Sequence, residues 1–480
     1  MTALALPARR VATEQPTAGL AVAAGLALAI LMQGLWIPVD ADVSWLITLS
    51  ERLLGGERLY VDLLEANPPA SVWLYLPQVW LAQQLGLRPE PLVIALAMAA
   101  AVGSIAWTMA LAARLLAAPH LQWLAAGLAF ILLVLPGGLF AQREHYALML
   151  ALPGLATLAM LSERQEVRLR LSIAAGLAAG TVSVIKPPLA LVFLLPAGWA
   201  LARTGSWRPL VAPVLSAAAV LACYAAALLS LAPEYLQVLP MLQATYLPMR
   251  ETATNLLLGP MLVLPATLCL IATTLRPPKT FLLPTILFQG SAGFALAGLT
   301  QGKNYLNHSY PGVALALLAL ALLLRVPGLE RGTRRVAALG LLLLAGLHLR
   351  ATVSVQPPPG LTEAISEAGR PGATVLILGT ELATGHPAVR LAGARWVGSR
   401  PSLFTAAAAR YVGLADPKVR RWYRADLDSF ARDVSTRCPD LILVEDRSRN
   451  WLMRDAAIRS ALNDYAPASR AGQIEVWRRR

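Results

Sequence analysis

Two aspartates, Asp40 and Asp42, stand directly after the first long apolar stretch of this 480-residue sequence. A carboxylate held at the edge of such a stretch can act as a general base on a hydroxyl group. A single acidic residue in a loop more often caps a helix or simply faces water. The pair is therefore a candidate for proton transfer only if the fold brings suitable groups beside it.

Three basic residues also adjoin apolar stretches, at Arg143, Lys186 and Lys303. Arg and Lys bind phosphate through charge-assisted hydrogen bonds and stabilise the charge that a leaving phosphate gains. Each has a plainer interpretation, such as an ion pair between Arg143 and Glu144 or a Lys186 side chain that extends toward lipid headgroups. Further polar groups near these cations are His145, His308 and Tyr310. A buried or interfacial histidine with satisfied hydrogen bonds is the plainer interpretation of both imidazoles.

The two histidines could in principle join Asp40 or Asp42 in a metal site. Neither histidine has a second ligand residue three or four positions away on a helix, which a compact site of this kind usually needs. The acidic residues match no calcium-loop spacing, and the turn at residues 379–385 lacks the nucleotide-binding glycine pattern. The three cysteines give no disulfide framework. We therefore expect no cofactor and no protein-bound metal ion.

The composition indicates a membrane protein, because 57% of the residues are hydrophobic and only 14% are charged. Windows of roughly 20 apolar residues predict eleven spans, near residues 17–38, 91–113, 121–138, 146–161, 169–185, 187–202, 209–231, 255–275, 281–299, 312–324 and 336–349. The net charge of +14 would suggest nucleic acid for a soluble chain. Here cytoplasmic loops account for much of it, and we expect no nucleic-acid partner.

The distribution of basic residues predicts the orientation. With the N-terminus in the cytoplasm, the cytoplasmic segments carry 14 basic residues in 54 positions and the opposite loops carry 7 in 95. This asymmetry has the direction that the positive-inside rule requires. The candidate polar residues then lie on the outer side. Residues 70–85 are short for a span, and we expect an interfacial helix with Trp73, Tyr75 and Trp80 at headgroup depth.

A change in composition near residue 351 predicts two domains, a membrane domain over 1–350 and an outer α/β domain over 351–480. The short apolar runs 373–378 and 440–444 are typical of buried strands, and 473–477 of an additional edge strand. Residues 356–360 are a proline-rich linker. The expected fold class is an all-α membrane bundle of about eleven helices with a small C-terminal α/β domain.

Several short motifs resemble those of the GT-C superfamily, the membrane glycosyltransferases that use polyprenyl-phosphate sugars. The first outer loop, 39–90, contains Asp42, Leu53-Leu54-Gly-Gly, Tyr60-Val-Asp62 and Asn67-Pro-Pro in that order. Similar motifs at later positions are Gln142-Arg143-Glu144-His145, Lys186-Pro-Pro and Gln301-Gly-Lys303 with His308 and Tyr310-Pro311. The resemblance is nearest to the branch of aminoarabinose and protein-mannosyl transferases. Two positions depart from that branch: Val43 stands where Glu is expected, and Asn67 where Lys is expected.

The resemblance implies a GT-C bundle and an inverting transfer of sugar from a polyprenyl-phosphate carrier to a glycan, lipid or protein acceptor of the cell envelope. Asp42 would be the general base, assisted by Asp40, while Arg143, Lys186 and Lys303 would bind the donor phosphate. The substrate pocket would comprise Tyr60, Asp62, Glu65, Asn67, Glu144, His145, His308 and Tyr310. The reaction would occur on the periplasmic face of the bacterial inner membrane, where the C-terminal domain also lies. The alternatives are a transporter or flippase of lipid-linked sugars and an O-antigen ligase or polymerase.

Overall fold

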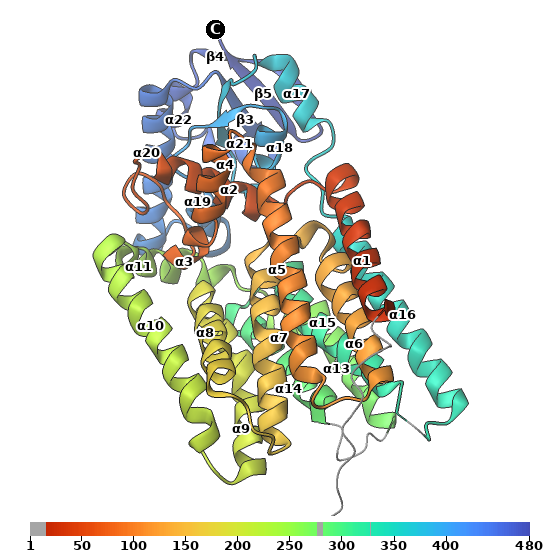
Figure 1. The fold of residues 1–480 in the computed structure, drawn as a ribbon. Helices are drawn as coiled ribbons and strands as arrows, with labels where there is room; N and C mark the ends of the chain where they lie inside the picture. Colours follow the sequence, from red (N-terminus) through yellow and green to blue (C-terminus); the bar gives the residue numbers. More distant parts are fainter. Residues whose placement is uncertain (1–15, 276–281, 327) are drawn as a thin grey trace, which may run out of the picture.

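Long apolar helices run side by side below a smaller domain of mixed helices and strands (Figure 1). The computed structural model describes residues 16–275, 282–326 and 328–480. The cytoplasmic segments expected at 1–16 and 276–280 therefore lie almost entirely outside the described residues.

Nine of the described helical segments are long and apolar enough to cross a membrane. They comprise α1 (Pro16–Leu31) with η1 (Met32–Trp36), α5 (Pro89–Ala112), α7 (Arg143–Ser162), η4 (Pro187–Phe193) with α9 (Leu194–Thr204), η5 (Arg208–Leu210) with α10 (Val211–Leu231), α12 (Ala253–Leu257) with α13 (Pro260–Thr274), α14 (Leu282–Gln301), α15 (Leu306–Leu323) and α16 (Arg331–Val353). Two shorter apolar segments, α6 (Ala118–Ala129) with η2 (Phe130–Val134) and α8 (Leu169–Ile185), lie at the other two expected positions. The chain is a multi-pass membrane protein.

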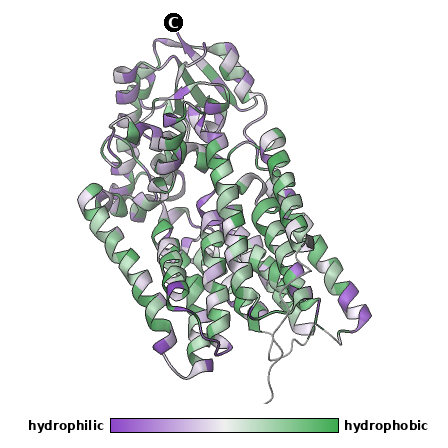
Figure 2. Cartoon of the chain, in the orientation of Figure 1, coloured by the Kyte–Doolittle hydropathy of each residue, from purple (hydrophilic) through white to green (hydrophobic). Residues whose placement is uncertain are grey.

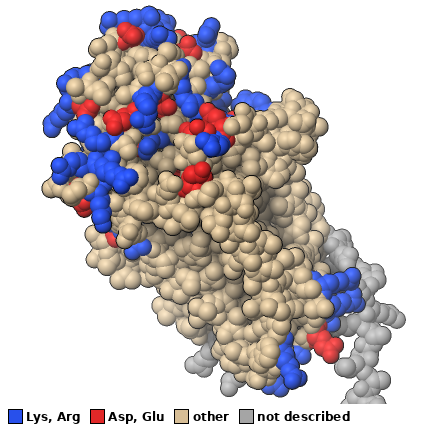
Figure 3. All heavy atoms as spheres, turned by 90° about the vertical axis from the view of Figure 1, so that its left-hand side faces the viewer, with Lys and Arg blue, Asp and Glu red and all other residues tan. Residues whose placement is uncertain are grey.

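Burial separates the centre of the bundle from its periphery. The apolar windows of α7 and α15 are 94% and 89% buried, whereas that of α10 is not buried at all. Figure 2 shows that the helices of the bundle consist mostly of hydrophobic residues. Figure 3 shows Lys and Arg gathered on the C-terminal domain and at the opposite end of the molecule, with a largely uncharged belt between them. Such a belt suits the hydrocarbon layer of a bilayer.

The loop after the first span folds into α2 (Ala41–Leu54), α3 (Pro69–Trp73) and α4 (Leu76–Gln84). The single interfacial helix expected over 70–85 is thus two short helices that meet at Leu74 and Tyr75. Tyr75 is fully buried and its hydroxyl donates to the Ala141 carbonyl at 2.7 Å. Its ring therefore packs in the core beside Tyr146 of α7 and does not face lipid, while its expected headgroup depth stays a prediction. Trp80 is 51% exposed and can face an interface.

The C-terminal domain contains a five-stranded sheet in the order β2-β1-β3-β5-β4. Its strands are β1 (Thr374–Leu378), β2 (Arg395–Trp396), β3 (Leu441–Glu445), β4 (Tyr465–Ala471) and β5 (Ile474–Arg479). The central β1 and β3 are parallel and buried, as their continuous apolar runs indicate. The segment expected to be an edge strand, β5, lies inside the sheet because β4 pairs with its other side.

Helices cover the sheet and connect its strands. They are α17 (Leu361–Ala368), η7 (Leu382–Thr384), α18 (Ala388–Leu391), α19 (Phe404–Val412), α20 (Pro417–Arg437), α21 (Asp446–Leu452) and α22 (Ala456–Ala461). The connection between α10 and α12 forms α11 (Tyr235–Thr245) and η6 (Leu247–Met249), and α19 and α20 pack against it. The short η3 (Gly137–Leu139) precedes α7. The domain therefore packs directly against the loops at this end of the bundle.

Candidate active site

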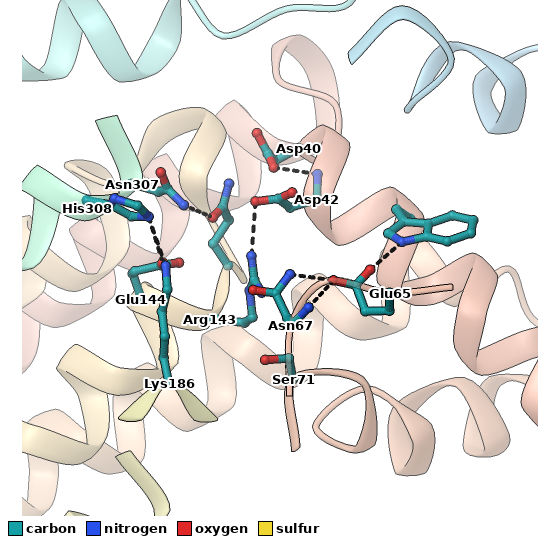
Figure 4. Close-up of polar contacts among 12 residues, drawn as sticks. Asp40, Asp42, Glu65, Asn67, Ser71, Arg143, Glu144, Lys186, Asn307 and His308 are labelled. Atoms are coloured by element: carbon teal, nitrogen blue, oxygen red, sulfur yellow. Dashed lines mark hydrogen bonds and ion pairs between the residues drawn. The ribbon is translucent and has the colours of Figure 1, made fainter. Parts of the chain in front are cut away.

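Four helix ends meet beneath the C-terminal domain and bring polar side chains together inside an otherwise apolar bundle (Figure 4). Asp40 and Asp42 belong to the start of α2, Arg143 begins α7, and Lys186 follows the end of α8. The fourth element, α15, contributes a histidine and an asparagine from its first turn. Because α7 and α15 are the most buried spans, their polar first turns come to lie near the bundle axis.

Asp40 and Asp42 have different environments although they are two residues apart. Asp40 is the N-cap of α2, and its Oδ1 accepts from the Asp42 backbone N–H at 2.8 Å. Asp42 instead lies in the first turn, where its Oδ2 accepts from Arg143 Nη2 at 3.2 Å. Burial, together with the nearby Asp42 charge, raises the pKa of Asp40 to about 7. Asp42 is thus the ion-paired carboxylate and Asp40 the one that can hold a proton near neutral pH.

A second ion pair lies beside the first. Lys186 Nζ donates to Glu144 Oε1 at 2.7 Å and lies 2.8 Å from His308 Nε2. Since an ammonium has only donors, the His308 Nε2 accepts and its ring proton lies on Nδ1. With Asp42 and Arg143, this pair makes a centre of two cations and two carboxylates. Buried charges of both signs partly compensate one another and make this polar centre tolerable.

The centre also contains buried polar atoms without a partner among the described residues. They are Arg143 Nε and Nη1, Glu144 Oε2 and His308 Nδ1. The side chain of Arg143 is only 4% exposed, so bulk water does not solvate its guanidinium freely. Unsatisfied buried polar atoms are costly, and their clustering makes this centre the candidate position for a polar ligand. Two guanidinium N–H groups are geometrically suited to phosphate oxygens.

Two further residues of this centre escaped the sequence prediction. The Asn307 amide donates to Gln142 Oε1 at 3.0 Å, joining the first turns of α15 and α7. Ser71 donates to the Ile185 carbonyl at 3.0 Å and so joins α3 to the residue before Lys186. Asn307 adjoins the candidate His308 in the sequence, which was the available signal. Ser71 had no such signal.

Three of the expected pocket residues brace the first outer loop. Glu65 accepts from Trp45 Nε1 at 2.6 Å and from the Asn67 backbone N–H at 2.8 Å. The side-chain amide of Asn67 also donates to Glu65. Tyr60 donates through its hydroxyl to the Asn67 carbonyl at 2.6 Å, and its ring lies 5.2 Å from that of Tyr235. Figure 4 shows Glu65 and Asn67 beside Arg143, so this bracing fixes the wall of the site.

The structure directs four other expected residues away from this centre. Lys303 donates to the Met249 carbonyl and stacks on the Tyr246 ring, with its Nζ 4.6 Å from the ring centroid. Asp62 accepts from the Arg58 backbone N–H at 2.8 Å and closes a local turn. His145 and Tyr310 are fully buried and bonded to backbone groups of neighbouring segments. His145 Nδ1 accepts from Ala141 N–H while Nε2 lies 2.9 Å from the Leu132 carbonyl, which leaves neither ring nitrogen free.

No metal centre is apparent in the described ranges, where no group of three or more His, Cys, Asp or Glu side chains is placed to hold an ion. The expectation that the chain needs no metal or other cofactor stays a prediction.

The C-terminal domain contacts the helix that carries the two aspartates, α2, through hydrogen bonds and ion pairs. Arg390 donates to both oxygens of Glu51, at 2.5 and 2.9 Å, to Glu90 Oε1 at 2.7 Å and to Thr48 Oγ1 at 3.2 Å. His386 Nδ1 lies 3.3 Å from Ser44 Oγ. Ser44, Thr48 and Glu51 are spaced by four and three residues and therefore share one face of α2. This contact sets the position of α2 and of its first turn.

Comparisons with known proteins address the fold. No protein-family model matches the sequence, and no curated protein matches it. The solved structure of ArnT from Cupriavidus metallidurans bound to undecaprenyl phosphate superposes with a TM-score of 0.61 at 14% identity, covering 97% of this chain and 98% of ArnT. Its apo structure gives a TM-score of 0.58 at 13% identity, over 96% and 97% of the two chains. ArnT is a GT-C glycosyltransferase. The chain has the GT-C fold.

Other GT-C proteins also align over most of this chain, including the oligosaccharyltransferase AglB from Archaeoglobus fulgidus at 10% identity. That match has a TM-score of 0.47 and covers 94% of this chain and 73% of AglB. The two ArnT structures alone confirm the expected resemblance to GT-C proteins, at the level of the fold.

Proposed function

We propose that this chain is a glycosyltransferase that moves a sugar from a polyprenyl-phosphate carrier to an envelope acceptor. The observation that carries the proposal is the buried centre formed by Asp42 and Arg143 beside Lys186 and Glu144. It combines a candidate base with cations suited to phosphate, at the outer ends of spans in a GT-C fold. ArnT, which has this fold, was solved with undecaprenyl phosphate.

The proposed reaction is an inverting displacement at the anomeric carbon. The acceptor oxygen forms the new bond to that carbon while its proton passes to Asp42, a general base. The bond between the carbon and the phosphate oxygen breaks, and its electron pair leaves with the phosphate. Arg143 and Lys186 stabilise the charge that the phosphate gains. Asp40, hydrogen-bonded to the Asp42 backbone, orients the first turn and, when ionised, increases the basicity of its neighbour.

The proposed location is the inner membrane, with the N-terminus in the cytoplasm and the centre on the periplasmic face. The excess of basic residues in the loops assigned to the cytoplasm supports this orientation. The C-terminal domain, 351–480, then also lies in the periplasm, since it covers the same end of the bundle as the centre (Figure 1). A lipid-linked donor reaches such a centre from within the outer leaflet.

Lipid mass spectrometry on a deletion strain tests the proposal. The strain is complemented with wild type, Asp42→Asn, or the control Asp464→Asn, which removes an exposed carboxylate from the loop between α22 and β4. We expect a polyprenyl-phosphate sugar to accumulate in the deletion and with Asp42→Asn, and to disappear with wild type and the control. Clearance by Asp42→Asn at the wild-type rate would reject Asp42 as the base. An unchanged carrier pool in every strain would reject the glycosyltransferase.

A further inference from the structure

A polar cavity separate from the ion-paired centre lies between the first outer loop and the C-terminal domain. Its volume is about 310 Å³, at the small end of the range for ligand pockets. One wall is the loop 60–64, and the other is the C-terminal half of α20 with residues 399 and 400. The seam between these walls is held by the Leu64 backbone N–H, which donates to the Ser399 carbonyl at 2.8 Å. A ligand in the cavity would therefore contact both domains.

Three arginines line the cavity, and only one of them lacks a counter-charge. Arg400 is paired with Asp426, and Arg437 donates to Glu57 Oε1 at 3.1 Å. Arg432 is exposed and its guanidinium makes no hydrogen bond or ion pair within the described residues. It lines the cavity from the C-terminal half of α20, one turn from Arg437.

The acidic residues of the wall contact other groups and form no ion pair with Arg432 among the described residues. Asp433 accepts from the Ser399 N–H at 2.7 Å and hydroxyl at 2.8 Å, and it also pairs with Arg437. Asp62 accepts from the backbone of Arg58. The cavity thus presents one guanidinium without an ion pair, together with the hydroxyl groups of Ser399, Ser429 and Thr436. This combination suits one acidic group attached to a body rich in hydroxyls.

We propose that this cavity binds an acidic saccharide, with Arg432 paired to its carboxylate or phosphate. The inference rests on the proposed function, because it makes the cavity a subsite for an anionic part of the acceptor. The loop that forms the wall continues into Glu65 and Asn67, which lie beside Arg143. Tyr60 joins the two parts of the loop, because it lines the cavity and donates to the Asn67 carbonyl. Acceptor binding therefore acts on the same loop that borders the reaction centre.

A binding measurement on the full chain in lipid nanodiscs tests the inference. The probes are D-glucuronate and D-glucose 6-phosphate, with D-glucose as the neutral comparison, titrated by saturation-transfer NMR. We expect Arg432→Ala to weaken the binding of the acidic probes by about tenfold or more, which corresponds to the loss of one charge-assisted hydrogen bond. Arg432→Lys should restore part of the affinity. The matched control is Lys418→Ala, which removes a positive charge from the same helix outside the cavity.

The outcomes separate the possible ligands from one another. Preferential binding of glucuronate assigns a carboxylate, and preferential binding of glucose 6-phosphate assigns a phosphate. Equal affinity for glucose, no binding of either acid, or an Arg432→Ala variant that binds like wild type would overturn the inference. Undecaprenyl phosphate binding is measured on the same samples. Its absence in wild type would count against the proposed function, whereas its presence with failed acid binding would reject only the cavity.

Discussion

Replacing Arg390 by Met should loosen the C-terminal domain from α2 without unfolding either part. The methionine keeps most of the aliphatic stem and removes the guanidinium that binds Glu51, Glu90 and Thr48. Because α2 carries the two aspartates in its first turn, loosening this contact should disturb them. The cations on α7 and α8 are held by separate contacts within the bundle. We therefore expect sugar transfer to fall more than binding of undecaprenyl phosphate.

The magnitude follows from the exposure of the three charged side chains. Those of Arg390 and Glu90 are 12% and 14% exposed, while that of Glu51 is 32% exposed. Removing one partner of a buried pair costs ~3–5 kcal/mol, whereas an exposed pair contributes only ~0.2–1 kcal/mol. The ion pairs of Arg390 are intermediate between these two cases. Arg390→Met should therefore cost ~2–4 kcal/mol of the free energy of domain docking. The fraction of molecules with the domain undocked should then rise by at least ~30-fold.

Hydrogen exchange measured by mass spectrometry can detect this change locally. The Leu64 amide, bonded to Ser399 across the domain seam, should lose protection by at least ~30-fold. The amides of β1 and β3 should keep theirs, because they lie within the domain's own sheet. Arg395→Met, at an exposed position on β2, serves as the matched control. Wild-type protection of Leu64 in Arg390→Met would refute the reasoning about domain docking.

Three further predictions concern the centre itself. Asp40 loses its proton as the pH rises through about 7, so the transfer rate should rise over the same range; Asp40→Asn should remove that step from the rate–pH profile, and an unchanged profile would contradict it. Lys186→Met should weaken undecaprenyl phosphate binding about tenfold or more, while Lys303→Met should change it less than about twofold, as equilibrium binding can show. His145→Phe should lower the free energy of unfolding by ~1–3 kcal/mol and leave the KM for the donor unchanged. A raised KM would place this ring in the pocket.

The contrast between Lys186 and Lys303 shows where sequence reasoning stops. Both stand at the outer end of an apolar stretch, and nothing in their immediate chemistry distinguishes them. Lys186 ends α8 in an extended conformation, and its amine turns toward Glu144. Lys303 follows Gly302, which has a φ of 66°, and its amine reaches the loop at Met249 instead. Hydropathy predicted that each residue lies at the end of an apolar stretch. The direction of each side chain depended on one local turn.

Longer-range contacts were even less accessible from the sequence. The apolar runs located the helical segments, and continuous hydrophobicity located β1 and β3. The bond between Arg390 and Glu51 joins positions 339 residues apart, and no periodicity predicts it. β5 was misassigned to an edge for a similar reason, since only the pairing with β4 decides its place. Local patterns therefore predicted the apolar helical segments and the two central strands but not β2 or β4, and tertiary packing decided which polar groups meet.

The charges at the centre suggest how it accommodates the proposed reaction. Within the two ion pairs, the charges of Asp42 and Glu144 balance those of Arg143 and Lys186. A sugar phosphodiester adds one negative charge, and the departing phosphate gains a second. In the proposed step Asp42 takes the acceptor proton as that second charge forms, so the total charge does not change. Neutralised Asp42 also binds its partner less strongly, because Arg143 then faces no carboxylate charge at that oxygen. The guanidinium is thereby released toward the phosphate when the phosphate is most negative.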